Sequence, residues 1–164
     1  MRQDGRVRCA LTDPLRSPAS HAAAFALRAS DTRSASDVTD VFLSHGHGDH
    51  VGGLAAFENA RVRGIAEEQA VLDEEEVDVT IDAPVVGGEF VQVAGQTIEV
   101  FHVPGHTVGS AVYLVNGVLL LGDSAVATPS GRLEQPPERF SDDVEELDES
   151  LLALRDLLRP RSGD

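Results

Sequence analysis

The most informative stretch of this chain is the run Ser44-His45-Gly46-His47-Gly48-Asp49-His50. It places three imidazoles and one carboxylate within positions 45 to 50. Neutral imidazole and carboxylate are good ligands for zinc, manganese and ferrous iron. A turn whose polar residues are merely solvated is the competing interpretation, but the density of ligand-type side chains favours a metal site.

The segments on either side place this cluster on a turn. Residues 38–43 (Val-Thr-Asp-Val-Phe-Leu) are typical of a buried strand, and residues 52–57 (Gly-Gly-Leu-Ala-Ala-Phe) are typical of the start of a helix. The cluster is therefore expected where a strand ends in a βα unit. Gly46 and Gly48 let the backbone turn tightly enough for neighbouring side chains to converge.

Two later segments complete a pattern of three motifs. Residues 103–110 (Val-Pro-Gly-His-Thr-Val-Gly-Ser) contain His106, and residues 119–124 (Leu-Leu-Leu-Gly-Asp-Ser) contain Asp123. In order and spacing, the three segments resemble the metallo-β-lactamase superfamily and, more closely, its glyoxalase II-like hydrolases. The resemblance spans about residues 37 to 158. It implies an α/β fold, a metallo-β-lactamase-like αββα sandwich.

The resemblance also implies a ligand set. One metal ion would be held by three histidines, the second by Asp49 and His50, and Asp123 would bridge the two ions. Asp49 is in addition the expected catalytic carboxylate. Zn²⁺ is the expected cofactor, as one or two ions, with Fe²⁺ or Mn²⁺ as alternatives. The three histidines of the first ion are His45, His47 and His106.

The chain departs from the family pattern at both ends. The family supplies one more histidine after the bridging aspartate, and here no histidine follows His106. The family also begins with paired strands and an Asp-x-Gly turn, which is absent before His45. We therefore expect an incomplete sandwich, truncated or divergent at both ends, with a weaker second metal site.

Charge divides the chain. Residues 1–36 hold six Arg and three Asp, whereas the other residues hold seven Arg and 25 Asp plus Glu. The whole chain has a formal charge of −15 and contains no lysine. Such acidity is typical of proteins that work at high salt. We predict an atypical, basic, poorly ordered segment over 1–36, either a disordered tail or a frameshifted replacement for the first strands, and a metallo-β-lactamase-like domain over 37–164.

The same composition limits partners and location. Strong negative charge argues against nucleic acid, because phosphate binding relies on Lys and Arg. Residues 21–27 are too short for a membrane span and lack the flanks of a signal peptide. With a single cysteine, Cys9, the chain has no internal disulfide. We expect a cytoplasmic protein with a small-molecule substrate and no membrane partner; the oligomeric state is left open.

Hydrophobic periodicity and turn signals predict the remaining elements. Tyr113 is expected in the core, and Arg132 and Arg139 near the mouth of the site, where they would either meet an anionic substrate or be solvated. A helix over Ser141–Leu158 is expected to begin at Ser141 as its N-cap. The other expected elements are a helix over 53–60, a strand over 62–65, an acidic surface excursion over 67–82, and paired strands over 89–93 and 96–103 and over 111–115 and 118–121.

Three functions stay open on this sequence. The first is a metal-dependent hydrolase of a small ester or thioester, in which a metal-bound hydroxide attacks the carbonyl. The second is an iron-dependent oxygenase of the persulfide dioxygenase type with a single ferrous ion. The third is a non-catalytic remnant that keeps the motifs but has lost its flanks. Metal content per chain separates them.

Overall fold

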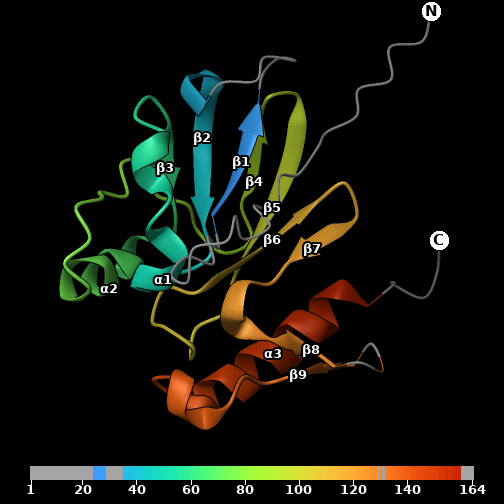
Figure 1. The fold of residues 1–164 in the computed structure, drawn as a ribbon. Coiled ribbons are helices and arrows are strands. Elements are labelled where there is room, and N and C mark those ends of the chain that lie inside the picture. The colour runs from blue at the N-terminus through green and yellow to red at the C-terminus, as the bar shows by residue number, and fades with distance from the viewer. Residues whose placement is uncertain (1–23, 29–34, 129, 131, 160–164) are drawn as a thin grey trace, which may run out of the picture.

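The computed structural model describes residues 24–28, 35–128, 130 and 132–159, and is built around two β-sheets (Figure 1). The first sheet has the order β1 (Ala24–Arg28), β2 (Val38–Leu43), β3 (Arg61–Arg63); β1 is antiparallel and β3 parallel to β2. The second is antiparallel, with the order β4 (Phe90–Val93), β5 (Gln96–His102), β6 (Ala111–Val115), β7 (Val118–Leu120). A short ribbon pairs β8 (Val126–Ala127) with β9 (Leu133–Glu134).

The two larger sheets pack against each other through a shared core. Phe42 of β2 lies in one cluster with Ile98 and Val100 of β5 and Tyr113 of β6. The rings of Phe42 and Tyr113 meet edge to face, with centroids 5.4 Å apart. Because side chains alternate along a strand, Val41 and Leu43 point away from this core. The predicted core position of Tyr113 is confirmed.

Helices cover the outer face of each sheet. Val41 and Leu43 pack with residues of α1 (Gly48–Val51) and α2 (Gln69–Glu74), among them the fully buried Leu72. On the other side, Phe101 of β5 and Val112 of β6 pack against α3 (Val144–Leu158). The layers are thus helix, sheet, sheet, helix, which confirms the α/β fold and the αββα arrangement.

Several expected elements are confirmed and others are corrected. Both predicted pairs of strands form, and the second pair is a hairpin that turns at Asn116 and Gly117. The helix expected over 53–60 is instead α1 followed by a 3₁₀ turn over Leu54–Ala56. The acidic excursion over 67–82 contains α2, which docks into the core through Leu72. The start of α3 is also different: its N-cap is Asp143, which accepts a hydrogen bond from the Glu146 amide, and not Ser141.

Residues 1–36 contain one described strand. β1 pairs with β2 along its length, from Ala24 opposite Leu43 to Arg28 opposite Val38. No strand was expected there from the sequence. The rest of that segment, residues 1–23 and 29–34, lies outside the described residues, and the division at residue 36 stays a prediction.

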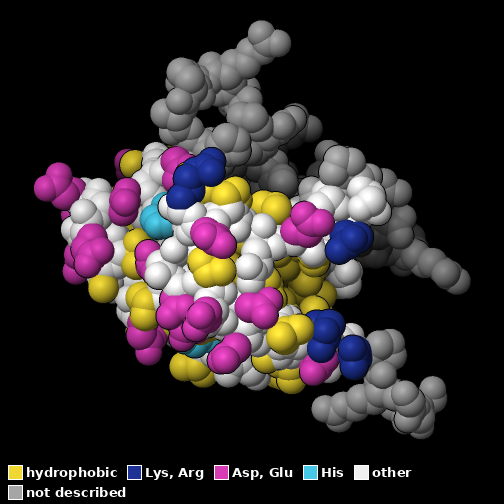
Figure 2. All heavy atoms as spheres, turned by 90° about the horizontal axis from the view of Figure 1, so that it is seen from below, with side chains coloured by type: hydrophobic (Ala, Val, Ile, Leu, Met, Phe, Trp, Pro, Cys, Tyr) yellow, Lys and Arg dark blue, Asp and Glu magenta, His cyan; other side chains and the backbone are white. Residues whose placement is uncertain are grey.

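The surface is strongly acidic. Figure 2 shows the face that looks downward in Figure 1, where Asp and Glu side chains are spread widely and few Lys or Arg side chains stand among them. None of the described helices combines the length and the apolar composition needed to cross a bilayer.

Candidate metal centre

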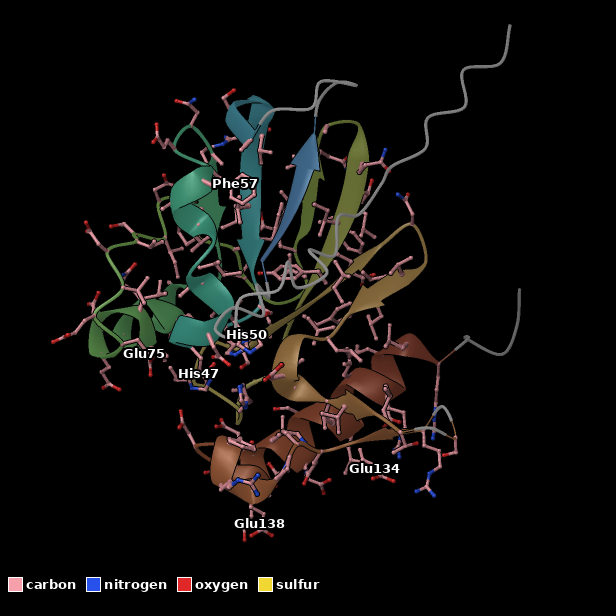
Figure 3. The ribbon with its side chains drawn as sticks, viewed as in Figure 1. His47, His50, Phe57, Glu75, Glu134 and Glu138 are labelled. Carbon is pink, nitrogen blue, oxygen red and sulfur yellow. The ribbon has the colours of Figure 1, made fainter. Side chains whose placement is uncertain are left out.

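The first histidine turn follows directly from β2. His45 is 1 % exposed, and the residues just before it are held to the second sheet: the Ala111 amide donates to Ser44 O at 2.7 Å, and the Tyr113 hydroxyl donates to Leu43 O at 2.6 Å. His47 occupies the N-cap position of α1 without a side-chain capping hydrogen bond, and His50 lies within that short helix. In Figure 3, His47 and His50 lie next to each other below the end of β2.

The second histidine turn follows β5 and is held by the start of α3. The Asp142 amide donates to His106 O at 3.2 Å, and the Asp143 amide donates to Gly105 O at 2.9 Å. Gly105 has φ +119°, and a Cβ atom there would overlap the backbone of Leu147. Only glycine fits this position, and the close packing holds His106 in its buried place.

The structure brings three of the predicted ligands to one point. The ring centroids of His45, His47 and His106 are 4.7 to 5.0 Å apart, and all pairs meet edge to face. One ligand atom from each ring lies within 4.8 Å of the others. This spacing suits a single cation bound by three imidazole nitrogens.

A second group shares His45 and adds His50 and Asp123, again with ligand atoms within 4.8 Å of one another. His50 Nε2 lies 3.3 Å from Asp123 Oδ2. The hydrogen bond with His50 lowers the pKa of Asp123 to about 2, against the opposing effect of burial. Asp123 is therefore a carboxylate at neutral pH, which is its ligating form.

Asp49 lies beside these groups and belongs to neither. Its side chain is 64 % exposed, and its Oδ2 is 3.6 Å from His50 Nε2. The structure thus brings His45, His47, His50, His106 and Asp123 into the two groups, and places Asp49 at their rim.

The histidines fit a metal ion on chemical grounds. Within the described residues, His45 Nε2 and both ring nitrogens of His106 are buried and have no hydrogen-bond partner. Buried polar atoms normally have one, and a cation would supply it. Burial lowers the pKa of both rings, and the neighbouring histidines lower them further. Both imidazoles are thereby kept neutral, as metal binding requires.

A cavity of about 500 Å³ opens over the site. Arg139 is the one Lys or Arg among its described lining residues, with its guanidinium carbon 4.3 Å from the centre of the Phe140 ring. The other predicted arginine, Arg132, is exposed and does not line it. Described lining residues are His47, Asp49, His50, Glu75, His106, Asp123, Arg139, Phe140, Ser141 and Asp142.

Sequence reasoning missed one residue that contacts both histidine turns. Glu68 is 1 % exposed and accepts hydrogen bonds from the Gly46 amide, the Thr107 hydroxyl and the Gly109 amide. Burial raises its pKa, and these hydrogen bonds oppose the rise. A signal was present: Glu68 shares helical spacing with the buried residues Ile65 and Leu72, which places all three on one face.

The structure is an αββα sandwich in which two groups of metal-ligand side chains lie near the ends of strands. Known proteins with similar sequences identify the class to which this fold and site belong. The family model of the metallo-beta-lactamase superfamily matches residues 8–160. The chain belongs to this superfamily, which confirms the resemblance found in the sequence.

Curated proteins named hydroxyacylglutathione hydrolase are among the relatives of this chain. A hydroxyacylglutathione hydrolase of Pseudomonas aeruginosa (strain LESB58) is 36 % identical over 132 residues, which is 77 % of this chain and 46 % of the relative. One of Dechloromonas aromatica (strain RCB) is 37 % identical over 102 residues, 62 % of this chain and 37 % of the relative. The chain thus spans less than half the length of these curated relatives.

Solved structures share the fold. The FEZ-1 metallo-beta-lactamase from Legionella gormanii aligns with a TM-score of 0.55 at 19 % identity, covering 74 % of this chain and 55 % of that one. TTHA1623, whose structure is described as a di-iron-bound form, aligns with a TM-score of 0.53 at 20 % identity, covering 75 % and 69 %.

Proposed function

We propose that this chain is a metal-dependent hydrolase that acts on a small ester or thioester. The observation that carries the proposal is the pair of histidine groups joined at His45 beneath an open cavity. The relatives named hydroxyacylglutathione hydrolase support a thioester as the substrate class. Zn²⁺ is the proposed cation, because its tetrahedral sites favour imidazole ligands.

The side chains divide the work by position. His45, His47 and His106 would hold the first cation, and Asp123 would reach it and a second cation near His50. Asp49, on the exposed rim, would complete the second site and is the proposed catalytic carboxylate, because its side chain lines the cavity. Such cations supply Lewis acidity and lower the pKa of a coordinated water.

The cavity suggests how a substrate is oriented. Its walls carry the carboxylates Asp49, Glu75 and Asp142, and Arg139 stands against Phe140 at the rim. We propose that Arg139 meets an anionic group of the substrate while the ester or thioester carbonyl faces the histidines. A small-molecule substrate fits a cavity of this size. A cytoplasmic location is part of the proposal and is supported by the single cysteine.

Metal content per chain is the first test. Protein purified at high salt without chelator or affinity tag should carry one or two zinc ions, and should release thiol from small acyl thioesters. The single cysteine, Cys9, adds only a constant background to a thiol-reactive dye.

A matched pair of variants locates the ions. His106→Ala should lose metal and activity, whereas His102→Ala, at an exposed histidine bonded to Val108 O, should keep both. Iron together with oxygen consumption would favour the oxygenase. A chain that cannot bind any metal would contradict the hydrolase proposal and would favour the non-catalytic remnant.

A further inference from the structure

Glu68 is a buried carboxylate that belongs to neither group of candidate metal ligands. It nevertheless contacts the two segments that carry His45, His47 and His106. It lies in the 3₁₀ turn Ala66–Glu68 that leads into α2, and it is 1 % exposed. Isolated buried carboxylates are strongly unfavourable, so a carboxylate at this position needs partners that compensate its desolvation.

Each oxygen of Glu68 binds a different turn. Oε1 accepts from the Gly46 amide at 2.6 Å, and Gly46 lies between His45 and His47. Oε2 accepts from the Thr107 hydroxyl and from the Gly109 amide, both at 2.8 Å, and Thr107 directly follows His106. One carboxylate therefore joins the two turns that supply the three histidines.

Both turns approach Glu68 closely at a glycine. A Cβ atom at Gly109 would lie 2.5 Å from the Glu68 amide nitrogen and 2.7 Å from Oε2, closer than real Cβ atoms come. A Cβ atom at Gly46 would lie 3.2 Å from Oε1. Ser110 supports the second turn, since its Oγ accepts from the Thr107 amide and lies 2.7 Å from Thr107 Oγ1.

We propose that Glu68 is a positioning residue that sets the distance between the two histidine turns and so holds the three imidazoles ready for a metal ion. The inference rests on the metal centre proposed above. Groups behind the ligands of a metal site commonly change metal affinity by about 10- to 100-fold when they are replaced. Glu68 acts one step further back, through the backbone of the turns rather than through a ring nitrogen.

The test compares Glu68→Gln with Glu67→Gln, which removes the same charge from the exposed neighbouring residue. A glutamine at position 68 has one acceptor oxygen and one NH₂ group that only donates. The NH₂ group would face an N–H or O–H of one turn, and that hydrogen bond would be lost. Metal-free proteins, shown to be folded by circular dichroism, are titrated with Co²⁺ alone, and affinity and the visible absorption spectrum are recorded.

We expect wild type and Glu67→Gln to bind Co²⁺ equally, and Glu68→Gln to bind the first equivalent about 10- to 100-fold more weakly, with an altered Co²⁺ spectrum. Equal affinity and an unchanged spectrum in Glu68→Gln would overturn the role of Glu68 and leave the metal centre intact. Failure of the wild type to bind Co²⁺ would overturn the metal centre itself, and with it the inference.

A second pair decides the matter if Glu68→Gln does not fold. Thr107→Val removes the hydroxyl that donates to Glu68 at nearly constant volume, and Thr107→Ser keeps it. Weaker Co²⁺ binding in the valine variant, restored in the serine variant, supports the proposal. Wild-type affinity in the valine variant would contradict it.

Discussion

Gly122 packs so closely against Ser44 that a Cβ atom on the glycine would lie 2.6 Å from both Cβ and Oγ of the serine. Gly122 precedes Asp123, and Ser44 precedes His45, whose Nδ1 lies 3.2 Å from Ser44 Oγ. The segments that carry these two proposed ligands therefore meet where the backbone of Gly122 packs against the side chain of Ser44. The gap between Asp123 and His45 is fixed by the absence of a side chain at Gly122.

Gly122→Ala should be markedly destabilising, because it combines two effects. Its φ of +54° is strained for alanine, by about 1 kcal/mol, and the overlap with Ser44 adds about 1–3 kcal/mol. Gly117→Ala is the control, since φ there is +77° and no other atom would lie within 4 Å of its Cβ. Urea unfolding of the metal-free proteins measures both. Equal losses in the two variants would show that the contact with Ser44 has no effect.

The start of α3 can be tested with two alanine variants. Asp143→Ala removes the cap that accepts from the Glu146 amide and should lower the free energy of unfolding by about 1 kcal/mol. Ser141→Ala should change it by less than about 0.5 kcal/mol, because Ser141 Oγ is buried without a hydrogen-bond partner among the described residues. Thermal unfolding followed by circular dichroism distinguishes them. A larger loss of unfolding free energy in Ser141→Ala than in Asp143→Ala would show that Ser141 is the N-cap.

Metal removal should lower thermal stability. A cation that binds only the folded chain, present at about 100 times its Kd, stabilises by about 2.7 kcal/mol, which corresponds to about 5–10 °C in Tm for a chain of this size. Calorimetry with and without a chelator measures the shift. His106→Ala should abolish most of it, and a shift that persists in that variant would place the metal elsewhere.

Acid should destabilise the metal-free protein from near neutral pH. Burial lowers the pKa of His45 and His106 in the folded state, so between the folded value and the unfolded value of about 6.5 the unfolded chain binds more protons. The free energy of unfolding should therefore fall as pH drops below about 6.5, by up to about 1.4 kcal/mol per pH unit for each histidine. Urea unfolding of wild type and His106→Asn between pH 7 and pH 5 tests this. Identical slopes would contradict it.

Local patterns predicted the parts of the fold that depend on neighbouring residues. The hairpin at Asn116 and Gly117 forms because both residues adopt positive φ, 51° and 77°, as such a two-residue turn requires. His45, His47 and His50 converge because they share one turn. The meeting of this turn with His106 followed from the family resemblance, since no local pattern brings β2 and β5 together.

The features that sequence reasoning missed depend on distant partners. Glu68 lies in the acidic stretch 67–82, which was expected on the surface, and its burial depends on amides at Gly46 and Gly109. Asp143 and Ser141 are equally good caps by residue type. Hydrogen bonds from the Asp142 and Asp143 amides to the His106 turn keep these residues outside the helix, and α3 begins after them.

The three-histidine group draws on both sheets, since His45 and His47 follow β2 and His106 follows β5. A cation can therefore be held only after the sheets have packed, late in folding. Interactions formed after the folding transition state change the unfolding rate rather than the folding rate. The protein with bound metal should then refold as fast as the metal-free chain and unfold more slowly. The cation would thus stabilise the assembled sandwich by lowering its unfolding rate.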